Sequence, residues 1–133
     1  MKEFQVNRIE LNGLLKLAKE SFDEAKNDLN DGFIRGAISS SYYCFLHLMR
    51  ALLLQKGIIT KSHQGVKIKF NQEFILNGSI DKKFGKIISD LFEDRLDADY
   101  APLQKFSKEQ AKEAIEFAKE FYEKVKKIIS SNL

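Results

Sequence analysis

The sequence predicts an all-α protein, an antiparallel up-and-down four-helix bundle with an additional short helix. The 133 residues include only one proline and seven glycines, so few positions interrupt a helix. Apolar residues recur at helical spacing in several long segments, and no stretch alternates between apolar and polar residues over six positions. The length suits a single core, so we expect one domain over residues 1–133.

The first two long helices are separated by a glycine turn. Apolar residues at helical spacing between Leu11 and Leu29 predict the first helix, and Gly32 is expected to end it in a left-handed conformation. The second helix, about Phe33 to Lys56, is apolar on two faces. Two apolar faces indicate either the centre of the bundle or an oligomer interface.

The middle of the chain is predicted to hold a connector, a short helix and a longer one. Ile58–Gly65 is expected to be the connector, followed by the short helix Val66–Leu76. The next helix covers about Ile80–Asp94. The stretch Leu96–Phe106 contains Pro102 and is predicted to be a loop.

The last helix carries the strongest start signal in the chain. Ser107 and Gln110 form a capping box, in which each side chain bonds the backbone of the other residue. The acidic residues of this helix come early and its lysines late, as the helix dipole favours.

Composition excludes several classes of function. The single cysteine, Cys44, rules out an intramolecular disulfide framework and a Cys-rich zinc site. The first residues lack the apolar run of a signal peptide, and we find no apolar stretch of about 18 residues, so a cytoplasmic chain without a membrane partner is expected. No phosphate-loop, dinucleotide-binding or metalloprotease motif occurs, so neither a cofactor nor a metal is expected.

Positive charge is concentrated in one block. The 41 residues between Asp31 and Glu73 contain no acidic residue, six lysines or arginines and both histidines. This block has a net charge of +6, whereas the whole chain has +3, so the remaining residues carry a net charge of −3. Such a block suggests an anionic partner such as RNA or a nucleotide phosphate, although solvated lysines flanking an apolar helix give the same pattern.

Two groups of candidate residues lie in this block. Tyr43, His47 and Arg50 share one face of the second helix, where His47 can transfer protons and Arg50 can bind an anion. Lys61 and His63 in the connector, followed by Lys67, can hold a phosphate, and the His can titrate near neutral pH. The alternatives are a satisfied polar network on the helix and an ordinary polar loop in the connector.

A third candidate is Arg95, which continues an apolar stripe of its helix. A guanidinium on an apolar face requires a partner, which is an acid, a carbonyl or a phosphate. Asp94, Asp97 and Asp99 are close in sequence, so an internal ion pair and a phosphate site are both open.

These motifs together resemble the HEPN domain family. Ser41–His47, Arg50–Leu53 and Gly57 resemble the long second helix of HEPN domains, and Lys61–Val66 and Arg95–Tyr100 follow in the order found in one prokaryotic subfamily. The resemblance implies a helical bundle that dimerises and a gene paired with a minimal nucleotidyltransferase, often as toxin and antitoxin. It also implies a metal-independent ribonuclease in many members.

The sequence departs from the family's active-site motif. The resemblance implies an Arg followed within a few residues by a His, the Arg stabilising the charged phosphate and the His moving protons. Arg95 matches the Arg, whereas Tyr100 takes the approximate place of the His. Because neutral Tyr is a poor base at pH 7, proton transfer is expected to fall to His63 or His47. By the same resemblance, Tyr100 is a candidate acceptor for adenylylation.

Three functional hypotheses follow. The first is a dimeric ribonuclease or toxin centred on Arg95, with His63 or His47 assisting. The second is an inert module that binds RNA or a nucleotide, or that serves as the helical partner of a nucleotidyltransferase. The third is an assembly scaffold. The candidate binding residues are Tyr43, Arg50, Lys61, Lys67, Asp99 and Tyr100.

Overall fold

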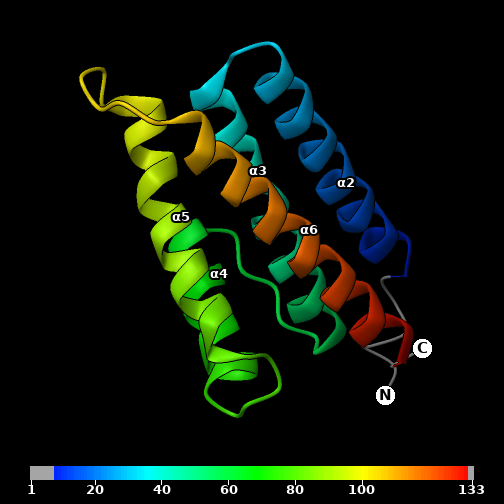
Figure 1. The fold of residues 1–133 in the computed structure, drawn as a ribbon. Coiled ribbons are helices and arrows are strands. Elements are labelled where there is room, and N and C mark those ends of the chain that lie inside the picture. Colours follow the sequence, from blue (N-terminus) through cyan, green and yellow to red (C-terminus); the bar gives the residue numbers. More distant parts are fainter. Residues whose placement is uncertain (1–7, 132–133) are drawn as a thin grey trace.

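The computed structural model describes residues 8–131 and shows an antiparallel bundle of α-helices (Figure 1). Its elements are α2 (Arg8–Asn30), α3 (Ile34–Gln55), α4 (His63–Phe70), the π-helical turn η1 (Asn71–Ile75), α5 (Lys82–Tyr100) and α6 (Lys108–Ser131). The four long helices alternate in direction, and the short α4 lies beside α5 (Figure 1). The predicted fold class is confirmed.

Helix α3 is the centre of the bundle. It packs against α2, α4, α5 and α6, and most of its residues from Ala37 to Leu54 are buried. Both of its apolar faces are therefore covered within one chain. Of the two alternatives raised by its sequence, the structure shows the helix at the centre of the bundle. Among the described residues α3 alone is long and apolar enough to cross a membrane by length and composition, but it is mostly buried as a core helix.

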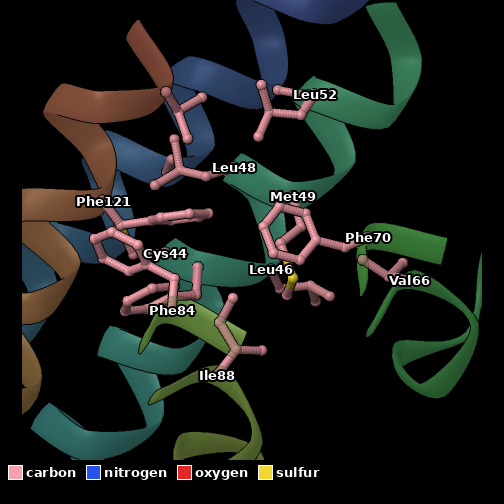
Figure 2. Close-up of a cluster of buried hydrophobic side chains, with 14 of the residues drawn as sticks. Cys44, Leu46, Leu48, Met49, Leu52, Val66, Phe70, Phe84, Ile88 and Phe121 are labelled. Atoms are coloured by element: carbon pink, nitrogen blue, oxygen red, sulfur yellow. The ribbon is translucent and has the colours of Figure 1, made fainter. Parts of the chain in front are cut away.

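An aromatic cluster joins α3 to three other helices (Figure 2). The Phe121 ring on α6 stacks on Phe45 of α3 at 4.7 Å between centroids and lies 5.2 Å from Phe84 of α5. Phe70 of α4 meets the same ring edge-on at 5.8 Å. All four rings are buried, so the cluster fixes α4 and α5 relative to α3.

A second, smaller cluster closes the other end of the bundle. Its buried members are mostly alanines, which let helix backbones approach closely; they are Ala25, Ala37, Ile38, Ala98, Ala111 and Ile115. This packing holds the C-terminal turn of α5 against the start of α3.

The prediction for the end of α5 was wrong. Leu96–Tyr100 is helical, and only the residues that follow Tyr100 form a loop. Leu91, Arg95 and Ala98 are buried at i, i+4 and i+7, so the apolar stripe continues past Asp94. The helix stops at Ala101, which has extended dihedrals because it precedes Pro102.

The prediction for the connector was also wrong at its end. Ser62 is an N-cap whose hydroxyl accepts from the Gly65 backbone N–H at 2.9 Å, so His63 begins α4. A Cβ on Gly65 would lie 2.5 Å from Thr60 Oγ1 and 2.7 Å from Ser62 Oγ, so glycine lets the chain turn into the helix here. His63 is thus held on a capped helix turn rather than on a loop.

Other predicted boundaries are confirmed. Ser107 and Gln110 form both bonds of the capping box, at 3.0 and 2.7 Å. Gly32 and Gly57 have positive φ at the ends of α2 and α3, as expected for residues that terminate helices.

Candidate functional site

Arg95 lies at the junction of α3, α4 and α5 and is only 7% exposed. Its guanidinium carbon is 5.2 Å from the ring centroid of Tyr42, 5.5 Å from Tyr43 and 5.9 Å from Phe92. Three aromatic faces at these distances stabilise a cation that has lost most of its water. We call Arg95, Tyr42, Tyr43, His63 and Asp99 the Arg95 centre.

His63 is the direct partner of Arg95. Arg95 Nη2 lies 2.6 Å from His63 Nδ1, and the Tyr42 hydroxyl lies 3.2 Å from the same nitrogen. The His63 ring also packs edge-on against Tyr43, with centroids 5.7 Å apart. The bundle therefore joins residues that are 32 positions apart in the sequence, within one protomer.

The remaining donors of Arg95 are poorly paired. Its Nε is buried with no hydrogen-bond partner among the described residues, and Nη1 lies 3.8 Å from an Asp99 carboxylate oxygen, beyond hydrogen-bond range. The Asp99 side chain is 30% exposed. The internal ion pair is therefore present but long, and it leaves donor capacity unused, which is unusual for a buried guanidinium.

Burial and positive charge shift the titrations around this centre. Burial, partly opposed by the Arg95 charge, raises the pKa of Tyr42 to about 12, so its hydroxyl keeps its proton. Burial, together with the charges of Arg95 and Arg50, lowers the pKa of His63. His63 is therefore a neutral imidazole at pH 7.

His47 lies near the centre but is not joined to it by a hydrogen bond. Its ring centroid is 6.4 Å from that of Tyr43, and its Nδ1 is buried without a partner in the described part of the chain. Burial, with added repulsion from Arg50 and His63, lowers the pKa of His47 to about 4. His47 is thus a neutral neighbour of the centre rather than a partner of Arg95.

The other basic candidates surround the centre at different places. Lys67 places its ammonium 5.0 Å from the Phe92 ring centroid, on the ring that also contacts Arg95. Arg50 and Lys61 instead line a separate cavity of about 150 Å³ between the starts of α2 and the connector, together with Glu10.

Tyr100 lies away from the Arg95 centre. It is the last residue of α5 and is 75% exposed. None of the ring contacts or hydrogen bonds found between residues 8 and 131 joins it to Arg95. The approximate position of a His in the family motif is therefore taken by a side chain on the surface.

Arg35 holds the end of α5. Its Nη1 donates to the carbonyls of Asp97 and Ala98, at 3.2 and 2.9 Å, and its Nη2 donates to the carbonyl of Ala101 at 2.9 Å. The same nitrogen also bonds the carbonyls of Pro102 and Gln104. These bonds pair the carbonyls that a helix C-terminus leaves free.

Two chemistries have no support within residues 8–131. No group of three or more His, Cys, Asp or Glu is placed to hold a metal ion. Cys44 is fully buried, and burial raises the pKa of its thiol to about 12, so it is a core residue rather than a nucleophile.

Sequence reasoning missed two rings that face Arg95, which are Tyr42 of the Arg95 centre and the neighbouring Phe92. Phe92 continues the apolar stripe of its helix, and Tyr42 lies within the Ser41–His47 run without being a candidate of its own. Only the packing of α5 on α3 shows that their rings face Arg95. One signal was available: a lone Arg on an apolar stripe needs aromatic or polar neighbours.

Comparison with known proteins agrees with this architecture. Residues 11–128 match the HEPN domain, and the chain belongs to the HEPN domain family. It is 36% identical over 112 residues to a UPF0332 protein of Thermotoga maritima, covering 84% of this chain and 85% of that protein. It is 32% identical over 126 residues to the protein named "Putative toxin MJ0605" of Methanocaldococcus jannaschii, covering 95% and 93% of the two chains. A second protein of that organism, "Putative toxin MJ0142", is 34% identical over 125 residues, covering 93% and 85%.

Proposed function

We propose that this chain is a toxin-like HEPN protein that binds RNA through a backbone phosphate at the Arg95 centre. The observation that carries the proposal is a buried guanidinium whose hydrogen-bonding capacity the protein leaves partly unused. A phosphate oxygen supplies the acceptors that Arg95 lacks, in charge-assisted bonds stronger than those between neutral groups. The names of the two M. jannaschii relatives support the toxin-like character.

The surroundings of Arg95 favour an anion. His63 approaches Arg95 from α4, and the Arg50 charge acts on His63 from α3. The Lys67 ammonium lies over the Phe92 ring, which Arg95 also contacts. Asp99 is the one carboxylate paired with Arg95 among the described residues. The distance of this ion pair is long, and the Asp99 side chain is partly exposed. A phosphate that displaces Asp99 from Nη1 replaces a weak contact by a stronger one.

Metal-independent RNA cleavage is the second candidate function. The contact of 2.6 Å between Arg95 and His63 favours it, because two neighbouring N–H donors can stabilise the charge that develops on the phosphate. In such a reaction the ribose 2′-hydroxyl loses its proton to water as its oxygen bonds the adjacent phosphorus. The bond from phosphorus to the 5′-oxygen breaks, and this oxygen takes up a proton from water. Within this proposal a homodimer, rather than the monomer, brings two such centres to one RNA.

The expected biological setting belongs to the same proposal. We infer a single cytoplasmic domain that works as a homodimer with a minimal nucleotidyltransferase as its protein partner. The exposure of Tyr100 supports the proposal of this partner, because an exposed hydroxyl at a helix end is accessible to a modifying enzyme.

The test is RNA binding by Arg95→Met. This variant removes the charge and keeps much of the side-chain volume. Fluorescence anisotropy with a labelled single-stranded RNA of mixed sequence is expected to show a loss of about tenfold or more in affinity. Lys112→Met removes the same charge from an exposed position on α6 and is expected to stay within about threefold of the parent.

The same samples, incubated with a chelator and run on a gel, test cleavage. Cleavage by the parent that is lost in Arg95→Met supports the ribonuclease, whereas binding without cleavage leaves the binding function alone. If circular dichroism shows both variants folded and Arg95→Met binds RNA as tightly as Lys112→Met, the proposed function is wrong.

A further inference from the structure

The hydrogen-bond partners of His63 determine which ring nitrogen carries the proton of the neutral imidazole. An arginine donates hydrogen bonds and accepts none, so an atom 2.6 Å from Arg95 Nη2 must be an acceptor. Nδ1 of His63 is that atom, and it accepts only when it carries no proton. The neutral ring then has its proton on Nε2.

The tyrosine hydroxyl beside the ring supports the same tautomer. Tyr42 Oη lies 3.2 Å from Nδ1, and this hydroxyl keeps its proton. Either donor, Arg95 or Tyr42, satisfies the lone pair. A proton on Nδ1 would instead face the donor N–H of Arg95 at close range.

A doubly protonated His63 is disfavoured by the positive charges that face it. Arg95 comes from α5, while Tyr42, Tyr43, His47 and Arg50 come from α3. None is an acid, and no carboxylate forms an ion pair with His63 in the described part of the chain. A positive imidazole would therefore stand beside two guanidinium charges.

The outer nitrogen of the ring is free to act. Nε2 has no hydrogen-bond partner among residues 8–131, and it is not among the buried polar atoms that lack one, so it reaches solvent. The same holds for Nη1 of Arg95. His63 Nε2 and Arg95 Nη1, which lie on either side of the contact between His63 and Arg95, thus both present N–H donors to solvent.

We propose that His63 serves the Arg95 centre as a neutral hydrogen-bond donor through Nε2–H, with Arg95 and Tyr42 keeping Nδ1 unprotonated. On this assignment, His63 and Arg95 hold phosphate oxygens together. This role in RNA binding rests on the proposed function. His63 is not the base that removes the 2′-hydroxyl proton, because its one free lone pair is occupied by Arg95.

The tautomer is tested without RNA, by long-range ¹H–¹⁵N NMR of the histidine rings in the full chain at pH 7. The expected spectrum for His63 has an unprotonated Nδ1 and a protonated Nε2. Arg95→Met is expected to raise the pKa of His63 and to relax this preference. A protonated Nδ1 in the parent would overturn the proposal whether or not the protein binds RNA.

The role is tested by two substitutions with the RNA of the binding assay. His63→Gln places an amide N–H near the position of Nε2–H and cannot titrate, whereas His63→Leu has no donor. A donor role predicts that Gln stays within about threefold of the parent and Leu loses about tenfold. If Gln and Leu are equally impaired while the parent binds RNA, the donor role is wrong. A parent that binds no RNA refutes the proposed function and with it this role, and the NMR result still decides the tautomer.

Discussion

Two arginines near the C-terminal end of α5, Arg95 on that helix and Arg35 on α3, use their hydrogen-bonding groups very differently. Arg35 bonds five backbone carbonyls from Asp97 to Gln104 and ties the end of α5 to the start of α3. Within residues 8–131, Arg95 bonds one ring nitrogen, leaves Nε unpaired and holds Asp99 only at 3.8 Å.

The difference teaches how to separate structural from functional charge in this fold. A guanidinium whose two Nη groups are bonded to backbone carbonyls, as in Arg35, stabilises the fold, and those donors are not available to a ligand. One that is buried among aromatic rings with donors left over is costly to the fold, and such groups concentrate at functional sites. His47, whose Nδ1 is also buried without a partner among the described residues, lies beside Tyr43, one of the rings that face Arg95.

The largest expected effect belongs to Arg35. Arg35→Ala leaves several carbonyls at the end of α5 without their donor and is expected to lower the free energy of unfolding by about 2–3 kcal/mol. Urea denaturation measures this change, and amide exchange should report faster opening near Ala98 and Ala101. A loss under about 0.5 kcal/mol would break the comparison, because Arg35 would then be no more structural than a surface residue.

The next effect is acid sensitivity from His47. Its folded pKa of about 4 lies below the ordinary value of 6.5, so the unfolded chain binds a proton first as the pH falls. The stability is therefore complete above about pH 6.5 and declines toward pH 4, by about 1–2 kcal/mol for a half-buried ring. His47→Leu should flatten this decline in urea titrations at several pH values. His63→Gln is measured alongside, because the lowered pKa of His63 acts in the same direction.

A smaller effect is expected from Asp99. Asp99→Asn removes the carboxylate that competes for Nη1 of Arg95 and is expected to strengthen RNA binding by about two- to fivefold. Glu116→Gln makes the same charge change at an exposed site on α6 and serves as the control. Weaker binding by Asp99→Asn would show that the carboxylate orients Arg95 rather than competing with the phosphate.

The smallest effect is expected for the stability of Arg95→Met, and it tests the comparison between Arg95 and Arg35 most sharply. Arg95→Met is expected to change the free energy of unfolding by no more than about 1 kcal/mol, because a buried charge is replaced by an apolar chain and Asp99 stays solvated. Equilibrium urea unfolding checks this. A loss as large as that of Arg35→Ala would assign Arg95 to the fold.

The bundle could be predicted from the sequence, whereas the composition of the site could be predicted only in part. Helical periodicity, Gly32 and the Ser107 cap are local signals, and they gave the helices and most of their ends. Arg95 was found because a charge on an apolar stripe is visible in sequence. The loop predicted for Leu96–Tyr100 is wrong, because Pro102 ends the helix only after Tyr100.

The pairing inside the site depends on tertiary contacts that no local pattern encodes. His63 and Arg95 lie on different helices and meet because the aromatic cluster around Phe121 fixes α4 and α5 against α3. Tyr42 faces them because of the rotation of α3 about its axis, which the burial of its two apolar faces sets. Sequence reasoning placed His63 on a loop, and the cap at Ser62 shows why it is instead held rigidly.

The most direct measurement follows the side-chain Nε–H resonances of ¹⁵N-arginine-labelled protein as RNA is added. If a phosphate binds at the Arg95 centre, the Arg95 resonance shifts with the binding curve. The Arg35 resonance stays in place, because the Nη groups of its guanidinium are bonded to backbone carbonyls. RNA that binds without moving the Arg95 resonance would contradict the central claim that its unused donors form the anion site.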